Sequence, residues 1–102
     1  MKFIPKSPSE VIPLIFDYRT RLGGLAAGAT IQSVDALTVD PTGELSIGTI
    51  GEALIDELSQ IEVAVVATGG TSPKIYACTC RSTVNHSGSE YVFDVVLHVL
   101  VR

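Results

Sequence analysis

The stretch YVFDVVLHVLVR, residues 91–102, carries the clearest structural pattern of this chain. Every second residue from Tyr91 to Val101 is apolar, and the residues between them mix Val and Leu with Asp94, His98 and Arg102. Since side chains alternate between the two sides of a β-strand, one side of this stretch is expected to pack on a hydrophobic core. A fully apolar side beside a mixed side is typical of a strand in a β-sandwich.

Residues 74–84 are expected to form the preceding strand, with Tyr76, Cys78 and Cys80 on one side. The linking segment, residues 85–89, reads NHSGS and predicts a hairpin loop. A disulfide between two cysteines at this spacing would be strained, and two cysteines are too few for a zinc site. We therefore expect Cys78 and Cys80 to be reduced thiols in the core.

Shorter strand-like runs, separated by turn residues, fill most of the remaining chain. Further strands are expected at residues 14–21, 29–39, 44–49 and 61–68. In the second of these runs the apolar positions change phase twice, which predicts a β-bulge near residues 33–35. Short strands with turns about ten residues apart predict a β-sandwich or a β-barrel.

Residues 50–61 fit two local structures. The apolar residues recur at helical spacing, as Ile50, Leu54, Leu58 and Ile61. The β-pattern on both sides favours instead a strand, a turn near residues 56–60, and a second strand. We expect the strand–turn–strand arrangement, with a short helix as the alternative.

The N-terminal residues 1–13 contain three of the five prolines of the chain. Proline lacks a backbone N–H group and resists helices and central strands. We therefore expect an extended, proline-rich arm at residues 1–13, followed by one β-sandwich domain at residues 14–102. Phe3 and Ile4 are the apolar anchors of this arm and the predicted interface residues, packing either on the same domain or on a neighbour.

The composition indicates a small domain that buries apolar surface in an assembly. Only 18% of the 102 residues are charged, against roughly 25% in a typical protein, and the mean hydropathy is +0.40. Burial against other subunits would hide the apolar surface that this composition leaves.

The net charge of −4 and the scattered basic residues argue against binding to nucleic acid or to a membrane. The sequence has neither a signal-peptide pattern nor a run of about 20 apolar residues, so we expect no secretion.

No arrangement of side chains in the sequence predicts catalysis, a metal site or a cofactor. His86 lies in the expected hairpin loop and His98 on a strand, and neither is flanked by a nucleophile motif. The adjacent acids Asp56 and Glu57 are expected to lie in a solvated turn. The glycine pairs match no phosphate-binding loop. We expect a protein that is not an enzyme and holds neither cofactor nor metal.

The order of these features resembles a family of small tailed-phage virion proteins, the fibre–tail adaptors. The resemblance covers roughly 85 residues, from Phe16 onward. Its motifs are FDYR at residues 16–19, LGG at 22–24, TIQS at 30–33, VDPTGELSIG at 39–48, a β-branched run ending in Gly-Gly-Thr at 63–71, and YACTC at 76–80. A Ser/Gly hairpin and a final apolar strand close the chain in the same order.

The resemblance implies an immunoglobulin-like antiparallel β-sandwich and no catalytic residues. It also implies a structural adaptor that joins tail or fibres to the phage particle, located in the virion and assembled in the host cytoplasm. The implied partners are copies of the chain itself, in a ring or another assembly, and neighbouring neck, tail or fibre proteins. The alternative is a carbohydrate- or receptor-binding β-sandwich module.

Overall fold

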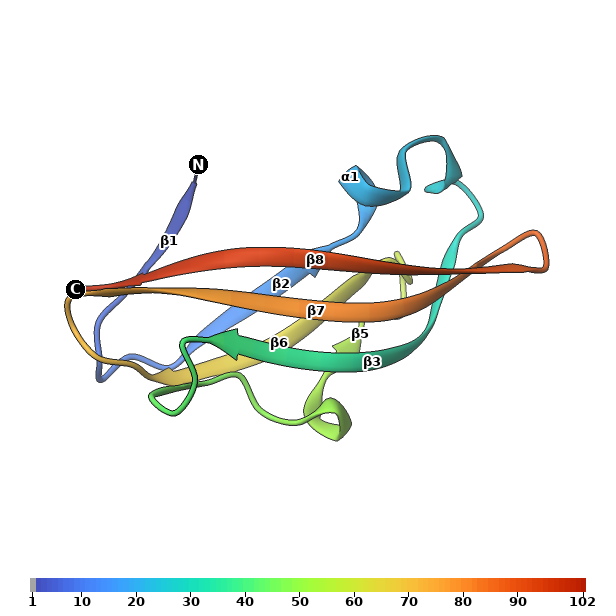
Figure 1. Ribbon diagram of the computed structural model, residues 1–102. Coiled ribbons are helices and arrows are strands. Elements are labelled where there is room, and N and C mark those ends of the chain that lie inside the picture. Colours follow the sequence, from blue (N-terminus) through green and yellow to red (C-terminus); the bar gives the residue numbers. More distant parts are fainter. Residues whose placement is uncertain (1) are drawn as a thin grey trace.

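The computed structural model describes residues 2–102, which form two β-sheets that face each other (Figure 1). One sheet has the strand order β1-β8-β7-β3: β1 (Phe3–Lys6), β8 (Ser89–Val101), β7 (Lys74–His86) and β3 (Thr30–Asp40). The other has the order β2-β6-β4, with β5 also paired to β6: β2 (Ile12–Asp17), β6 (Glu62–Gly69), β4 (Leu45–Ser46) and β5 (Leu54–Ile55). The predicted β-sandwich is confirmed.

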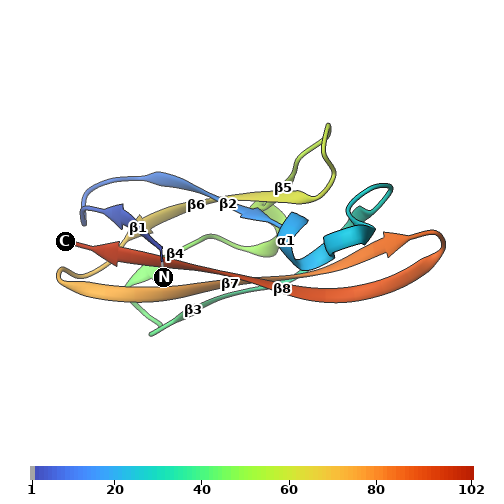
Figure 2. The same ribbon diagram turned by 90° about the horizontal axis from the view of Figure 1, so that it is seen from above.

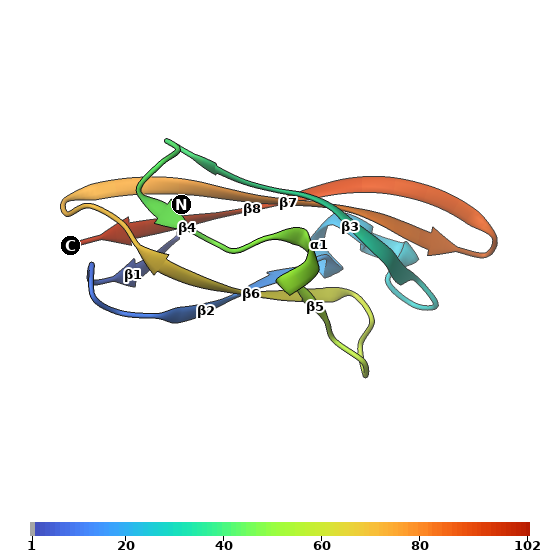
Figure 3. The same ribbon diagram turned by 90° about the horizontal axis from the view of Figure 1, so that it is seen from below.

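The hydrophobic core lies between the two sheets, which form separate layers when viewed from above and below (Figures 2 and 3). Both sheets contribute fully or almost fully buried side chains, among them Leu14, Phe16, Val63, Val65, Tyr76, Cys78, Cys80, Val99 and Val101. These residues follow the two-residue period of their strands, which places them on the inner side of each sheet. The alternation at residues 74–84 and 91–102 therefore predicted the inner sides correctly.

The β7–β8 hairpin is longer than the sheet that faces it. Each of its strands has 13 residues, whereas β2 has six and β6 has eight. Its tip consequently extends past the facing sheet (Figure 2). The apolar side of β8 is fully buried only at Val99 and Val101, while Phe93, Val95 and Leu97 are half-buried. The expectation that this whole side belongs to the core is corrected at the hairpin tip.

The first expected strand, at residues 14–21, ends earlier than the alternation predicted. β2 stops at Asp17, and the chain turns into a short helix, α1 (Arg19–Leu22), followed by the 3₁₀ turn η1 (Gly23–Leu25). The Asp17 carboxylate accepts a hydrogen bond from the Arg19 backbone N–H at 2.9 Å, which favours this turn.

Tyr18 fixes the end of β2 to the opposite sheet. Its side chain is buried, and the hydroxyl donates a hydrogen bond to the Cys80 carbonyl at 2.9 Å. The Tyr18 hydroxyl oxygen also lies 2.9 Å from the hydroxyl oxygen of Ser82, which is buried as well. Burial raises the pKa of the Tyr18 hydroxyl, so the group stays neutral and can donate.

The structure resolves the two alternatives for residues 50–61 in favour of strand–turn–strand. A 3₁₀ turn, η2 (Ile50–Glu52), precedes the two-residue strand β5, and a turn leads into β6. Thr49 and Glu52 form a capping box, in which each side chain bonds to the backbone N–H of the other residue.

The N-terminal segment is incorporated into the sandwich and does not form a separate arm. β1 pairs in parallel with the end of β8, from Phe3 opposite His98 to Lys6 opposite Val101. β2 then begins at Ile12, so the expected boundary between residues 13 and 14 falls inside a strand. Pro5 is tolerated in β1 because an edge strand leaves one side without a partner. Met1, the first residue of the expected arm, lies outside the described residues.

Strand β3 carries the irregularity that the phase shifts predicted. Its antiparallel pairing with β7 changes register between Ile31 and Ser33 and again between Val34 and Ala36. The predicted β-bulge near residues 33–35 is confirmed.

Both cysteines are buried and free, as expected. Burial raises the pKa of the Cys78 thiol to about 11, and it also raises the pKa of the Cys80 thiol. Since the thiolate is the reactive species, both groups are inert in the folded protein near neutral pH.

Glu44, just before β4, links the two sheets through hydrogen bonds of its carboxylate. One of its carboxylate oxygens accepts hydrogen bonds from the Lys74 ammonium and the Tyr76 hydroxyl, both at 2.8 Å. The other oxygen accepts one from the Thr71 hydroxyl at 2.8 Å. These bonds, the one from Lys74 above all, lower the pKa of Glu44 to about 2.

The Glu44 carboxylate should make the stability of the protein sensitive to acid. Its folded pKa of about 2 lies below the usual 4.5, so its contribution is complete above about pH 4.5 and is lost as the pH falls toward 2. As the pH falls over this range, the urea concentration at the unfolding midpoint should therefore decrease less steeply for Glu44→Gln than for the wild type. Glu57→Gln, on an exposed loop, is the control and should keep the wild-type slope. Equal slopes for Glu44→Gln and wild type would contradict this role.

Candidate interaction surfaces

The outer side of the β2-β6-β5 sheet presents apolar side chains to solvent. In the sheet register Ile15 of β2 and Leu54 of β5 both lie opposite Ala64 of β6, and Pro13 lies opposite Val66. The exposed fractions of Ile15, Leu54 and Val66 are 46%, 69% and 55%. We call Pro13, Ile15, Leu54, Leu58, Ala64 and Val66 the apolar face.

Leu58 extends the apolar face from the turn between β5 and β6. The turn is closed by Asp56, whose carboxylate accepts the Ser59 N–H at 2.8 Å and whose carbonyl accepts the Gln60 N–H at 2.9 Å. Gln60 adopts a positive φ of 59°. This tight turn holds Leu58 at its tip, where 96% of the residue is exposed. Together with the rest of the apolar face, Leu58 forms an exposed apolar patch, and such patches are typical of contact sites for another molecule.

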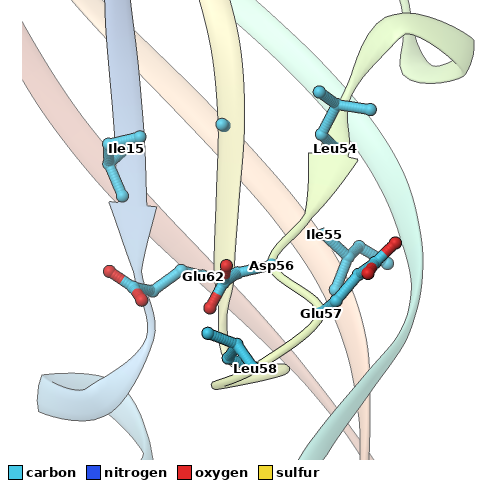
Figure 4. A pocket seen from close by; sticks show the side chains of 8 residues that line it. Ile15, Leu54, Ile55, Asp56, Glu57, Leu58 and Glu62 are labelled. Atoms are coloured by element: carbon cyan, nitrogen blue, oxygen red, sulfur yellow. The ribbon is translucent and has the colours of Figure 1, made fainter.

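The apolar face contains an open hollow of about 600 Å³ with an acidic rim (Figure 4). Ile15 and Leu54 stand on either side of it, with Leu58 at one end. Asp56, Glu57 and Glu62 supply the carboxylates. Its apolar floor and charged edge match the apolar centre and polar rim of a protein–protein interface.

The basic side chains near this rim do not neutralise it. Arg19 pairs with Asp17 at 2.8 Å and approaches Glu62 at 3.6 Å. Within residues 2–102, Asp56 and Glu57 have no ion-pair partner. The Ser59 backbone N–H, which donates to Asp56, is the main cause that lowers the pKa of that carboxyl. The rim is therefore negatively charged at neutral pH.

The two predicted interface residues, Phe3 and Ile4, are neighbours on β1 and therefore point to opposite sides of the sheet. Ile4 is half-buried and packs against the core. Phe3 lies edge-on to His98, with ring centroids 6.3 Å apart, and is 38% exposed. Both residues thus contact their own domain, and Phe3 also presents an aromatic surface to solvent.

The apolar face was not identified from the sequence. Two signals were present, and the first is that Ile15 stands on the polar side of its strand, beside Asp17. The second was the helical spacing of Leu54 and Leu58, in which both residues turn out to be exposed. Exposed and buried apolar residues are of the same amino-acid types, so the fold is needed to distinguish them.

Among the described residues, no cluster of three or more histidine, cysteine or acidic side chains is placed to bind a metal. Over the same range, no helix has the length and apolar character that a membrane crossing requires.

A family model described as "Podophage GP4 fiber-tail adaptor protein gp77" matches residues 6–98. This match takes in every strand except the first part of β1 and the end of β8. No curated protein and no solved structure matches the chain. Because the match covers almost the whole sandwich domain, the chain belongs to the podophage fiber-tail adaptor family.

Proposed function

We propose that this chain is a structural, non-enzymatic component of the phage virion that joins tail or fibres to the particle. The observation that carries this proposal is the family match over residues 6–98. The exposed apolar face with its acidic rim supports it, because an adaptor needs a surface that stays open until a neighbour covers it.

The proposed partners are further copies of the chain, in a ring or another assembly, and neighbouring neck, tail or fibre proteins. Phe3, with Ile4 behind it, is the proposed contact of the N-terminal edge. Assembly in the host cytoplasm and the lack of contact with nucleic acid or membrane complete the proposal. The net charge of −4 supports the last point. The comparisons give no support to the carbohydrate- or receptor-binding alternative.

We further propose an immunoglobulin-like connectivity for the sandwich. The orders β2-β6-β4 and β8-β7-β3 correspond to strands B-E-D and G-F-C of that fold. β1, paired in parallel with the last strand, would take the place of a first strand that has moved to the second sheet.

Assembling particles without this chain tests the proposed function. We expect particles whose tails or fibres are not properly attached, visible by negative-stain electron microscopy. Supplying the wild-type chain should restore them, as should Ile75→Ser, which alters an exposed residue of the other sheet. Normal, fibred particles in the absence of the chain would refute the adaptor role.

A further inference from the structure

We propose that the apolar face receives the N-terminal edge, Lys2 and Phe3, of a second copy of this chain. This inference rests on the proposed self-assembly and specifies which surfaces of two copies meet. The contact is head-to-tail, because the two surfaces belong to different parts of the molecule.

The charge of the rim disfavours the symmetric arrangement. If two copies met through the same apolar face, the acidic rim of one copy, which includes Asp56 and Glu57, would be brought against the acidic rim of the other. Like charges placed together at an interface disfavour it. A partner for this face has to bring positive charge to the rim and an apolar group to the floor.

The N-terminal edge meets both requirements. Four of the seven basic residues are engaged elsewhere: Arg19, Lys74 and Arg81 are in ion pairs, and Lys6 is buried with hydrogen bonds to the Ser7 and Gly69 carbonyls. Arg21 lies over the ring of Phe93, 5.9 Å from its centroid. Lys2 and Arg102 are exposed and, within residues 2–102, unpaired.

Lys2 directly precedes the exposed ring of Phe3, so one short segment offers a cation beside an aromatic group. The hollow has the complementary features, which are an apolar floor at Ile15 and Leu54 and the carboxylates of Asp56 and Glu57 beside it. An aromatic anchor in an apolar pocket, with opposite charges at its edge, is a common form of interface hot spot.

The positions of the two surfaces permit a repeating contact. β1 and the end of β8 lie at one end of the molecule, whereas the β5–β6 turn lies toward the other end (Figure 2). The molecule is 44 Å along its longest axis. A head-to-tail pair leaves one apolar face and one N-terminal edge free, so further copies can add to it. The repeated contact forms a ring if the rotation between copies closes, and an open filament if it does not.

Charge reversal in two separate variants tests the contact. Glu57→Lys changes the rim and Lys2→Glu changes the edge, and both residues are exposed. Each variant alone should self-associate about tenfold or more weakly than wild type in sedimentation velocity. An equimolar mixture should regain association, because the altered rim accepts the altered edge and the wild-type surfaces still fit each other. Ile75→Ser, on the other sheet, is the control and should associate like wild type.

Cysteine cross-linking gives a second readout. A mixture of Phe3→Cys and Leu58→Cys chains should form a disulfide-linked heterodimer, while the buried Cys78 and Cys80 stay silent. Phe3→Cys mixed with Val92→Cys, at the exposed hairpin tip, should not.

If wild type associates but the reversals, their mixture and the cross-links have no effect, this interface is wrong and the proposed function stands. If wild type remains monomeric at high concentration, a second copy is not the occupant and the inference fails. The particle experiment then decides the adaptor role separately.

Discussion

Val99→Asp is expected to abolish folding. Val99 lies on β8 with no exposed surface, opposite Tyr76 of β7 and Ile4 of β1. An aspartate there would place an unpaired charge in the core, at a cost of several kcal/mol. The total stability of a domain of this size is about 5–15 kcal/mol, so little or nothing would remain.

Val92→Asp is the matched control on the same strand. Val92 points to the outer side and is 61% exposed, so its substitution should leave the melting temperature within a few degrees of wild type. Circular dichroism melting curves of the soluble proteins check both variants. Similar melting of Val99→Asp and Val92→Asp would mean that the two sides of β8 have been assigned wrongly.

Gly69→Ala should destabilise the protein by about 3 kcal/mol while the fold persists. Gly69 ends β6 with φ of 78°, where an alanine is strained. A Cβ at this position would lie 2.8 Å from the backbone carbonyl oxygen of Glu44, which is fixed by the pairing of β4 with β6. The backbone strain of Gly69→Ala and its close contact with Glu44 both lower the stability. Neither can be relieved alone, because the φ angle and the neighbouring backbone are held by the same strand pairing.

Gly24→Ala provides the comparison for this substitution. Gly24 has no positive φ, and a Cβ added to it would have no neighbouring atom within 4 Å, so the methyl group meets open space. Urea denaturation of both variants measures the difference in free energy of unfolding. An equal midpoint for Gly69→Ala and Gly24→Ala would contradict the close approach of β4 and β6.

The β7–β8 hairpin was predictable because its period-2 pattern is long and coincides with burial. Tyr76, Cys78 and Cys80 occupy every second position of β7, and all three are fully buried. The pattern could not reveal how much of β8 is covered, since coverage depends on the length of the facing strands. Val95 reads like Val99 in the sequence but is half-buried, because the facing sheet is shorter than the hairpin.

The region at 50–61 shows how a surface site can resemble another secondary structure. Its helical spacing comes from Ile50, Leu54 and Leu58, which are exposed, together with Ile61, which is buried. A helical pattern implies that the apolar residues share one buried side, and here they do not. The β-context gave the correct structure, whereas the role of the exposed leucines required the fold.

The placement of β1 depended on a long-range pairing. Phe3 to Lys6 pair with residues almost 100 positions later in the sequence, and the prolines around them obscured the strand. Proline does disfavour central strands, but β1 is an edge strand, where the missing N–H is tolerated. The apolar anchors Phe3 and Ile4 were identified from the sequence, but their division between surface and core was not.

The central claim is that this sandwich joins tail or fibres to the assembled particle. Electron cryomicroscopy of intact virions tests it most directly. We predict several copies of the sandwich where tail or fibres join the particle, each with Phe3 of one copy against Leu54 and Leu58 of the next. Purified, fibred virions that contain no copy of this chain would contradict the claim.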